Sequence, residues 1–318
     1  MIDPHPIVLV AMGGHAFMQK GEAGTIEEHE KNAATIASLL MTLVERNYYL
    51  CVTHGNGPQV GNLLVQQELP GSEVPKLPLD VLVAMTEGSL GYILQQALLN
   101  ELRKRQMKRY VVTVVTQVVV DENDPAFLAP SKPIGPFLSR EEAERRRDRL
   151  GWKVKEDAGR GWRRLVPSPQ PLRVIQRHMI RDAVSQGHIV VACGGGGIPV
   201  KKQPDGQFAG LEAVIDKDLT SSALAADIGA ALLVILTAVP QVYVNYGKPD
   251  QRALGAVTLE EIETLHAQGH FPPGSMGPKV EAVIRFLKAG GRRALITDPE
   301  SLPAAIDGRA GTHFVGGI

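Results

Sequence analysis

Three lysines stand out because glycine, proline or aspartate residues surround each of them. Lys132 lies in "SKPIGPF", Lys217 lies between two aspartates in "AVIDKDL", and Lys279 follows the turn in "PGSMGPK". Cations of this kind suit phosphoryl transfer, because negative charge spreads over the oxygens of the transferred group and positive charge stabilises it. The lysines therefore favour phosphoryl transfer without a covalent nucleophile.

Two aspartates beside the second lysine supply the negative charge that such a site needs. Asp216 and Asp218 flank Lys217 where a helix is expected to begin. A carboxylate here could hold a lysine in place or bind Mg²⁺, since magnesium needs only one or two carboxylates besides phosphate oxygens. Both alternatives stay open from the sequence.

Glycine clusters follow three apolar runs: "MGGHA" at 12–16, "THGNGPQVG" at 53–61 and "ACGGGGIPV" at 192–200. Glycine tolerates positive φ and lets backbone N–H groups approach a ligand. A helix that starts just after such a turn adds partial positive charge, so we expect each turn to be able to hold a phosphate. None matches the P-loop or the dinucleotide fingerprint, which disfavours those two classes.

Other chemistries find little support. The nine histidines form no H-E-x-x-H motif, and no paired C-x-x-C or G-x-S-x-G occurs. Cys51 and Cys193 end apolar runs, so we expect buried, reduced thiols. A disulfide, or a nucleophilic role for Cys193, is the alternative.

The elements that must position these residues alternate along the chain. Short β-branched runs predict strands, and longer periodic segments predict helices between them. This alternation predicts an α/β fold with a mainly parallel sheet, where ligands bind at the carboxyl ends of the strands. The strands are expected at 7–12, 48–53, 110–120, 188–193, 231–237 and 293–297, and the helices at about 26–46, 79–106, 171–186, 217–229 and 276–289.

Residues 121 to about 171 interrupt the alternation with scattered prolines and one basic stretch. A segment of this length predicts an inserted subdomain or lid. We interpret the run "REEAERRRDR" as a solvated helix face, with a nucleic-acid patch as the alternative. Lysine plus arginine number 34, as do aspartate plus glutamate, and this balance argues against nucleic-acid partners. The first residues lack a basic signal region and no run suits a membrane span.

The chain resembles the carbamate kinases of the amino acid kinase superfamily over essentially its whole length. The strings that carry the resemblance occur in the family's order. They are "HGNGPQVGNLL" (54–64), "TQVVVD" (116–121), "KPIGPF" (132–137), "KEDAGRGWRRLVPSP" (155–169), "CGGGGIPV" (193–200), "EAVIDKDL" (212–219), "VNYGKPD" (244–250) and "PGSMGPKVEA" (273–282).

The resemblance implies reversible phosphoryl transfer between ATP and carbamate with Mg²⁺, giving ADP and carbamoyl phosphate. It implies a cytoplasmic homodimer that acts mostly toward ATP in catabolism, for example of arginine, with small-molecule substrates as its partners. The implied fold is a three-layer αβα sandwich around an eight-stranded, mainly parallel sheet. One domain, 1–318, would comprise a carbamoyl-binding part (1–190) with a protruding lid subdomain (about 121–171) and a nucleotide-binding part (191–318).

The family's functional residues map onto positions of this sequence. The resemblance implies a catalytic set, a substrate set around the transferred groups, and a nucleotide set, with Mg²⁺ held mainly by ATP phosphates and no protein ligand assigned to it. The catalytic set is Lys132, Lys217, Asp218 and Lys279; the substrate set is Gly13, Gly14, His15, Gly55, Asn56 and Gly57; the nucleotide set is Gly195, Gly196, Asp216, Thr237, Tyr243, Tyr246, Met276 and again Lys279.

Two positions depart from the family pattern. His15 stands where the family's first turn normally has asparagine, and Pro240 stands where an aspartate is usual. Proline lacks an N–H donor, so nucleotide affinity can differ. A histidine can replace the amide as a donor with pH-dependent activity, weaken the transfer, or mark another acceptor. The competing hypotheses are therefore a related acylphosphate-forming kinase and a weakened nucleotide or carbamoyl-phosphate binding protein.

Overall fold

The computed structural model describes residues 5–13, 16–19, 21–68, 74–157 and 159–316. Its centre is an eight-stranded sheet in which every neighbouring pair is parallel except β16–β17. The predicted α/β class and the eight-stranded, mainly parallel sheet are confirmed. In spatial order the strands are β15 (Ala256–Thr258), β17 (Thr312–Val315), β16 (Arg293–Thr297), β12 (Leu232–Leu236), β1 (Ile7–Met12), β2 (Tyr49–His54), β9 (Ile189–Val191) and β3 (Val111–Thr113).

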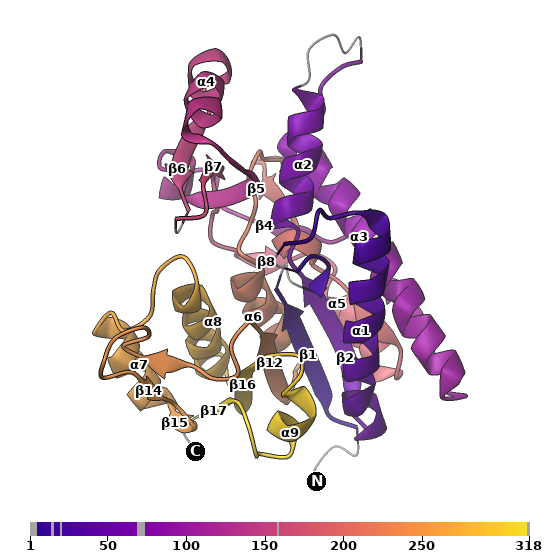
Figure 1. The fold of residues 1–318 in the computed structure, drawn as a ribbon. Coiled ribbons are helices and arrows are strands. Elements are labelled where there is room, and N and C mark those ends of the chain that lie inside the picture. The colour runs from indigo at the N-terminus through magenta and orange to yellow at the C-terminus, as the bar shows by residue number, and fades with distance from the viewer. Residues whose placement is uncertain (1–4, 14–15, 20, 69–73, 158, 317–318) are drawn as a thin grey trace.

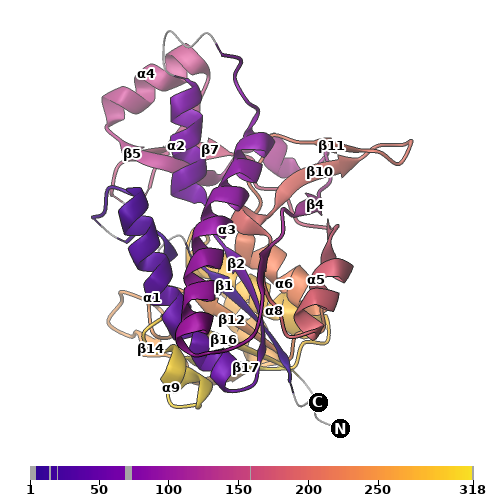
Figure 2. The same cartoon turned by 90° about the vertical axis from the view of Figure 1, so that its right-hand side faces the viewer.

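Helices cover both faces of this sheet (Figures 1 and 2). The faces alternate along β1, where Val8 and Val10 belong to one apolar cluster and Leu9 and Ala11 to the other. The first cluster includes α1 (Ile26–Glu45), α3 (Leu79–Lys104) and α9 (Leu302–Ile306), and the second includes α5 (Arg177–Ser185), α6 (Lys217–Asp227), α7 (Leu259–Ala267) and α8 (Met276–Lys288). The chain therefore has the expected three layers.

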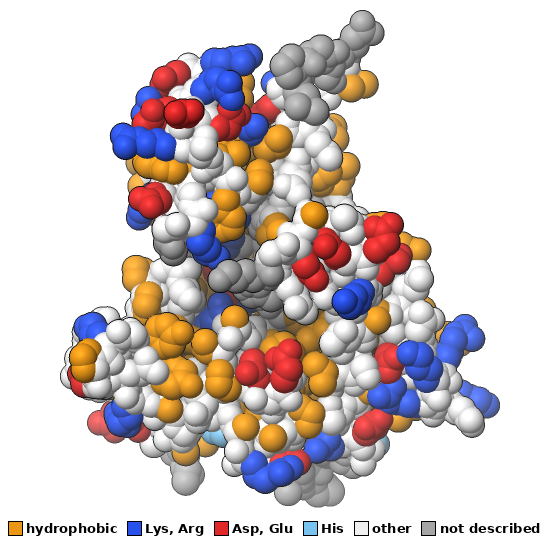
Figure 3. All heavy atoms as spheres, in the orientation of Figure 1, with side chains coloured by type: hydrophobic (Ala, Val, Ile, Leu, Met, Phe, Trp, Pro, Cys, Tyr) orange, Lys and Arg blue, Asp and Glu red, His pale blue; other side chains and the backbone are white. Residues whose placement is uncertain are grey.

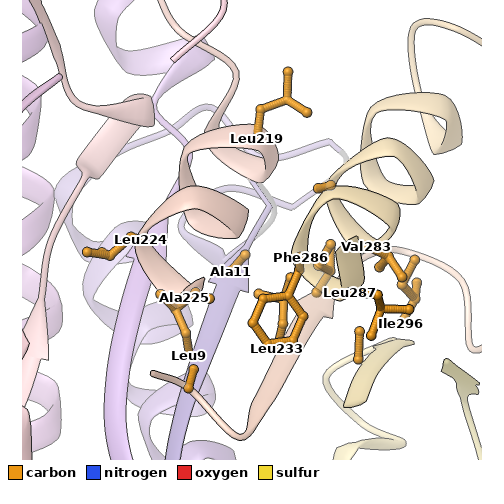
Figure 4. Packing of buried hydrophobic residues seen from close by; sticks show 14 of the residues in the cluster. Leu9, Ala11, Leu219, Leu224, Ala225, Leu233, Val283, Phe286, Leu287 and Ile296 are labelled. Carbon is orange, nitrogen blue, oxygen red and sulfur yellow. The ribbon is translucent and has the colours of Figure 1, made fainter. Parts of the chain in front are cut away.

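The packing of α6 and α8 matters most for the site. Figure 4 shows Leu224 and Ala225 of α6, and Val283, Phe286 and Leu287 of α8, packed beside the central strands. Phe286 is fully buried. Each fully buried large apolar side chain stabilises the fold by about 1.5–3 kcal/mol. This core fixes the N-termini of both helices, and those ends carry Lys217 and Lys279.

Two expected elements differ in the structure. The run 110–120 is not one strand, because side chains of α3 bind its N–H groups: Thr113 donates to Gln95 and Thr116 donates to Glu87. Its second half is β4 (Gln117–Val119), which joins a separate sheet. The helix expected from 171 begins only at Arg177, because Arg173–Val174 pair with β4 as β8. That sheet has the order β11 (Phe208–Gly210), β10 (Ile198–Lys202), β4, β8.

The segment expected as an insertion projects from the sheet beside α2 (Gly57–Gln67), as Figures 1 and 2 show. Its three-stranded sheet is made of β5 (Lys132–Leu138), β7 (Trp162–Val166) and β6 (Lys153–Glu156). Its helix α4 (Arg140–Leu150) is largely exposed, as expected for the basic run. We call these four elements the lid subdomain.

The remaining pair is β13 (Tyr243–Val244) with β14 (Arg252–Ala253). Within the described ranges, no helix is both long enough and apolar enough to span a membrane.

Candidate active site

Three lysines from three separate elements converge on two aspartates. Lys132 Nζ of β5 lies 3.1 Å from Asp216 Oδ2. Lys217 Nζ of α6 lies 2.5 Å from Asp218 Oδ1, and Lys279 Nζ of α8 lies 3.1 Å from Asp218 Oδ2. These five side chains carry three positive and two negative charges, so the cluster has a net positive charge that suits an anionic phosphate.

The local sequence explains why the aspartates sit where they do. Asp216 is the N-cap of α6, and its Oδ1 accepts from the N–H groups of Asp218 and Leu219. Its other oxygen is left for Lys132. Asp218, in the first turn, is 3% exposed and faces the two other lysines.

The electrostatics of the cluster follow from burial and pairing. Burial raises the pKa of Asp218, but Lys217 and Lys279 outweigh it, so the net pKa lies well below the ordinary value. Burial lowers the pKa of Lys217, and the charge of Lys279 lowers it further. For Lys279, burial is outweighed by Asp218 and Asp216, so its pKa is raised. The charged form of Asp218 thus holds the two lysines together.

Figure 3 shows a hollow between the lid subdomain and the main sheet, with lysine or arginine side chains inside it. The first two glycine turns lie at the carboxyl edge of the parallel strands, where a ligand is expected. Gly13 follows β1, and Gly55 follows β2, where its N–H donates to the carbonyl of Met12. Gly14 and His15 lie outside the described residues.

The second glycine turn continues directly into α2. Asn56 is its N-cap residue, but the Asn56 side chain makes no cap bond and donates instead to Thr86 Oγ1 at 2.8 Å. The side chain is thus buried against α3. This leaves the N-terminus of α2, starting at Gly57, without a side-chain cap, which favours an anionic ligand there.

The third glycine turn differs from the expectation. No helix follows it directly, because strand β10 begins at Ile198. Gly195 and Gly196 are buried in the left-handed region, with φ of 67° and 99°. A Cβ on Gly195 would lie 2.2 Å from the Asn56 amide, and one on Gly196 would lie 2.5 Å from the carbonyl oxygen of Ile215. This turn packs the site together, and its contact with nucleotide stays a prediction.

The other residues expected around the nucleotide lie beside α8 and β12. Thr237 follows β12 and donates its N–H to Thr297 O. Tyr243 and Tyr246 have ring centroids 5.7 Å apart, and Tyr246 is 59% exposed. Met276 begins α8, whose N-terminus lacks a side-chain cap, and Pro240 is exposed in the loop after β12. The contact of these residues with nucleotide stays a prediction.

Sequence reasoning missed Arg163 of the lid subdomain. Its side chain is 12% exposed, and its Nε donates to the carbonyl of Gly135 at 3.0 Å. Its Nη2 would lie 4.0 Å from a Cβ placed on Gly57, so it faces the N-terminus of α2. The string "GRGWRRLVP" was part of the resemblance, but nothing in its spacing distinguishes Arg163 from its neighbours.

Glu87 of α3 was also missed. It is 1% exposed, its Oε2 accepts from Thr116 N–H at 2.8 Å, and its Oε1 has no hydrogen-bond partner among the residues that the structure describes. Burial raises the pKa of its carboxyl well above the ordinary value, although the N–H groups of Thr116 and Gly194 oppose this. The neighbouring His54 is also buried, which lowers its pKa to about 4. Glu87 therefore links α3 to the third glycine turn.

We expect Glu87→Gln to remove a pH-dependent loss of stability. Because the pKa of Glu87 is higher in the folded than in the unfolded chain, the folded state binds more protons above the unfolded pKa. The free energy of unfolding therefore falls as pH rises toward the folded pKa, by about 1.4 kcal/mol per pH unit in that window. Glutamine keeps an acceptor for Thr116 and does not ionise.

Urea unfolding between pH 5 and pH 8 measures this effect. The stability of Glu87→Gln should rise relative to that of the unmodified protein as pH increases. The matched control is Glu30→Gln, at an exposed position of α1. Parallel stability curves for Glu87→Gln and the unmodified protein would contradict the assignment.

Both cysteines are free and buried, as expected. Burial raises the pKa of Cys51 to about 12 and that of Cys193 well above its ordinary value. A nucleophilic cysteine needs a lowered pKa. The structure therefore does not support the alternative role of Cys193.

The carboxylates fit lysine partners better than a resident metal. Among the described residues, no group of three or more histidine, cysteine, aspartate or glutamate side chains is arranged to hold a metal ion. Asp216 and Asp218 instead pair with lysines. A magnesium ion here would depend mainly on phosphate oxygens, with at most one or two of these carboxylates.

Comparison with known proteins found relatives of similar sequence and similar fold. Residues 6–298 match the model of the amino acid kinase family. A carbamate kinase of Thermococcus kodakarensis is 48% identical over 97% of this chain and 98% of its own length. The structure of a carbamate kinase from Giardia lamblia bound to citric acid has a TM-score of 0.94 at 38% identity, covering 98% of this chain and 99% of its own. The same Giardia enzyme bound to AMP-PNP has a TM-score of 0.90.

Proposed function

The chain belongs to the amino acid kinase family, and from this premise we propose that it transfers a phosphoryl group reversibly between ATP and carbamate. The products are ADP and carbamoyl phosphate. The observation that carries the proposal is the convergence of Lys132, Lys217 and Lys279 on two aspartates at the carboxyl edge of the sheet. The full-length likeness to proteins named carbamate kinase supports carbamate as the acceptor.

In the direction of ATP formation, an oxygen of the ADP β-phosphate attacks the phosphorus of carbamoyl phosphate, and the bond from phosphorus to the carbamate oxygen breaks. Lys217 and Lys279 stabilise the negative charge on the transferred group. Asp218 orients both lysines, since its two oxygens bind one each. Lys132 approaches from the lid subdomain and neutralises charge on the leaving carbamate side.

In this proposal each half of the chain binds a different substrate. Residues 191–318 bind the nucleotide, with Tyr243, Tyr246, Thr237 and Met276 beside the adenosine and Lys279 at the phosphates. Residues 1–190 bind the carbamoyl group at the N-terminus of α2, beside the Arg163 guanidinium, which also pairs with Asp157 at 3.2 Å. The lid subdomain, about 121–171, covers this half.

Mg²⁺ accompanies the nucleotide in this proposal. When bound, it supplies positive charge to the phosphates. Because Asp216 and Asp218 are paired with lysines, we propose that phosphate oxygens supply most of the ligands of the metal.

We also infer a homodimer in the cytoplasm. On α3, Val81, Met85 and Tyr92 are exposed and recur at helical spacing, which suits a second copy of the chain. The two free thiols suit a reducing compartment. Light scattering should give twice the mass of one chain, and a monomer at micromolar concentration would contradict the dimer. We further propose that the reaction runs mainly toward ATP in the cell, as part of a catabolic pathway such as arginine breakdown.

His15 separates the proposed enzyme from the weakened binding protein. With ADP, Mg²⁺ and carbamoyl phosphate, the unmodified protein should form ATP, with a rate that depends on pH if His15 acts as a donor. A His15→Asn variant should then be active with a flatter pH profile. A protein that is thermally stabilised by ADP but turns over only as His15→Asn would instead be the disabled homologue.

The acceptor is tested in the opposite direction. With ATP and Mg²⁺, ADP release should depend on ammonia and bicarbonate together, which supply carbamate. A faster reaction with another carboxylic acid would favour the acylphosphate-forming alternative.

A further inference from the structure

Helix α2 and strand β5 cross with no side chain between their backbones. A Cβ placed on Gly61 of α2 would lie 2.0 Å from Gly135 Cα and 2.1 Å from Gly135 N, far closer than real Cβ contacts. Gly135 itself has a φ of +78°, a conformation that glycine adopts most readily. Two backbones in contact cannot yield as a flexible side chain would, so the crossing requires glycine at Gly61.

The crossing lies between two parts of the site. Four residues before Gly61, α2 begins at Gly57, directly after the second glycine turn. Three residues before Gly135, β5 begins at Lys132, whose Nζ contacts Asp216 at 3.1 Å. The position of β5 on α2 therefore determines where Lys132 lies relative to the anion-binding end of the same helix.

Hydrogen bonds also join the lid subdomain to α2 and to the crossing. Arg163 of β7 donates to the Gly135 carbonyl at 3.0 Å, and Glu68, the C-cap of α2, accepts from Trp152 Nε1 at 2.9 Å and from Arg164 at 2.7 Å. Between α2 and α4, by contrast, a cavity of about 230 Å³ remains. The backbones of α2 and β5 thus approach most closely at the two glycines, beside the buried apolar contact of Val60 and Ile134.

We propose that Gly61 is a positioning residue for phosphoryl transfer, which sets the place of Lys132 through its backbone contact with Gly135. The inference rests on the proposed function, because it assigns a catalytic task to Lys132. A methyl group at Gly61 pushes β5 away from α2 and withdraws the Lys132 ammonium from the transferred group. The nucleotide half, built on α6, α8 and β12, is not displaced.

The test compares Gly61→Ala, Lys132→Met and the double variant in the ATP-forming assay. We expect Gly61→Ala to lower kcat by about 10–100-fold, because misplacing a catalytic group by an ångström costs about that much. The KM for ADP should stay within about twofold. In the Lys132→Met background, Gly61→Ala should cost less than about threefold, because the group that it misplaces is already absent.

Tryptophan fluorescence can report a shift of the lid subdomain. Its two tryptophans, Trp152 and Trp162, both lie in the lid subdomain, and Trp152 bonds to Glu68 of α2. Tryptophan emission of Gly61→Ala should therefore differ from that of the unmodified protein in the absence of ligand. The matched control is Gly255→Ala, where an added Cβ meets no atom within 4 Å; both activity and emission should be unchanged.

Three outcomes would overturn the inference. One is an active unmodified protein whose Gly61→Ala variant keeps its kcat. Another is a full additive loss in the double variant, which would mean that the methyl group acts on the glycine turn and not through Lys132. An inactive unmodified protein would overturn the proposed function as well, so the two failures are distinguishable. If Gly61→Ala does not fold, Gly135→Ala carries the test instead. Its Cβ would lie at an ordinary contact distance of 3.4 Å from Gly61 Cα, but alanine rarely adopts the φ of +78° at this position, so we expect β5 to shift on α2.

Discussion

Lys217→Ala should lower the rate of ATP formation by at least about 10²–10³-fold, because it removes a cation placed to stabilise the transferred group. The Lys217 side chain is only 11% exposed and contacts Asp218 at 2.5 Å. No other described lysine can take its place, since Lys279 already occupies the second oxygen of Asp218.

The same substitution should leave the thermal melt nearly unchanged. Burial lowers the pKa of Lys217, so keeping its ammonium group charged in the folded protein costs free energy that the variant does not spend. Asp218 keeps Lys279 as its partner after the substitution. Turnover with a coupled ATP assay and the melting temperature are the two measurements, with Lys31→Ala at an exposed position of α1 as the control. A fully active Lys217→Ala variant would refute the assigned role.

Asp218→Asn should damage both activity and stability. It leaves Lys217 and Lys279 buried together without their shared carboxylate, and breaking a buried ion pair in this way costs about 3–5 kcal/mol. The two lysines also lose the group that aligns them, so we expect a loss of at least about 10²-fold in kcat. Asp205→Asn is the control, because Asp205 is exposed and its turn is one that asparagine also forms.

The pH dependence gives this prediction a second measurement. The pKa of Asp218 is lower in the folded chain than its ordinary value of 3.8, so its stabilising effect is present above pH 3.8 and is lost as pH falls toward the folded pKa. The stability gap between the unmodified protein and Asp218→Asn should narrow by about 1.4 kcal/mol per pH unit below 3.8. Urea unfolding at pH 5 and pH 3 measures the gap. An equal gap at both values would contradict the role of the ionised carboxylate.

Much of the architecture could be predicted because it depends on local pattern. The buried parallel strands appear as continuous apolar runs, so β1, β2, β12 and β16 were predicted within a residue or two. The short strands β15 and β17 carry too few residues for such a signal. The run 110–120 divides because Gln95 and Glu87, which lie 18 and 29 residues from the N–H groups they bind, accept hydrogen bonds from it. These contacts are tertiary, and the sequence of the run itself contains no signal of them.

In the candidate site too, features that depend on local pattern could be predicted, and features that depend on tertiary contacts could not. Each lysine was recognisable from the turn beside it, but their meeting depends on the topology that brings the lid subdomain over α6 and α8. The turn of Gly195 and Gly196 is expected to face phosphate, which stays a prediction, and the structure adds that its glycines make room for Asn56 and Ile215. Arg163 and Gly61 matter through what lies opposite them, which a single sequence does not reveal.

The central claim is that the lysine cluster transfers a phosphoryl group from carbamoyl phosphate to ADP. The most direct measurement is ATP formation by the purified protein with ADP, Mg²⁺ and carbamoyl phosphate, followed by a coupled assay from pH 5.5 to 9. We predict ATP in proportion to enzyme concentration, and its loss in Lys217→Ala. Undetectable ATP formation over that whole pH range, in a protein with a cooperative thermal melt, would contradict the claim.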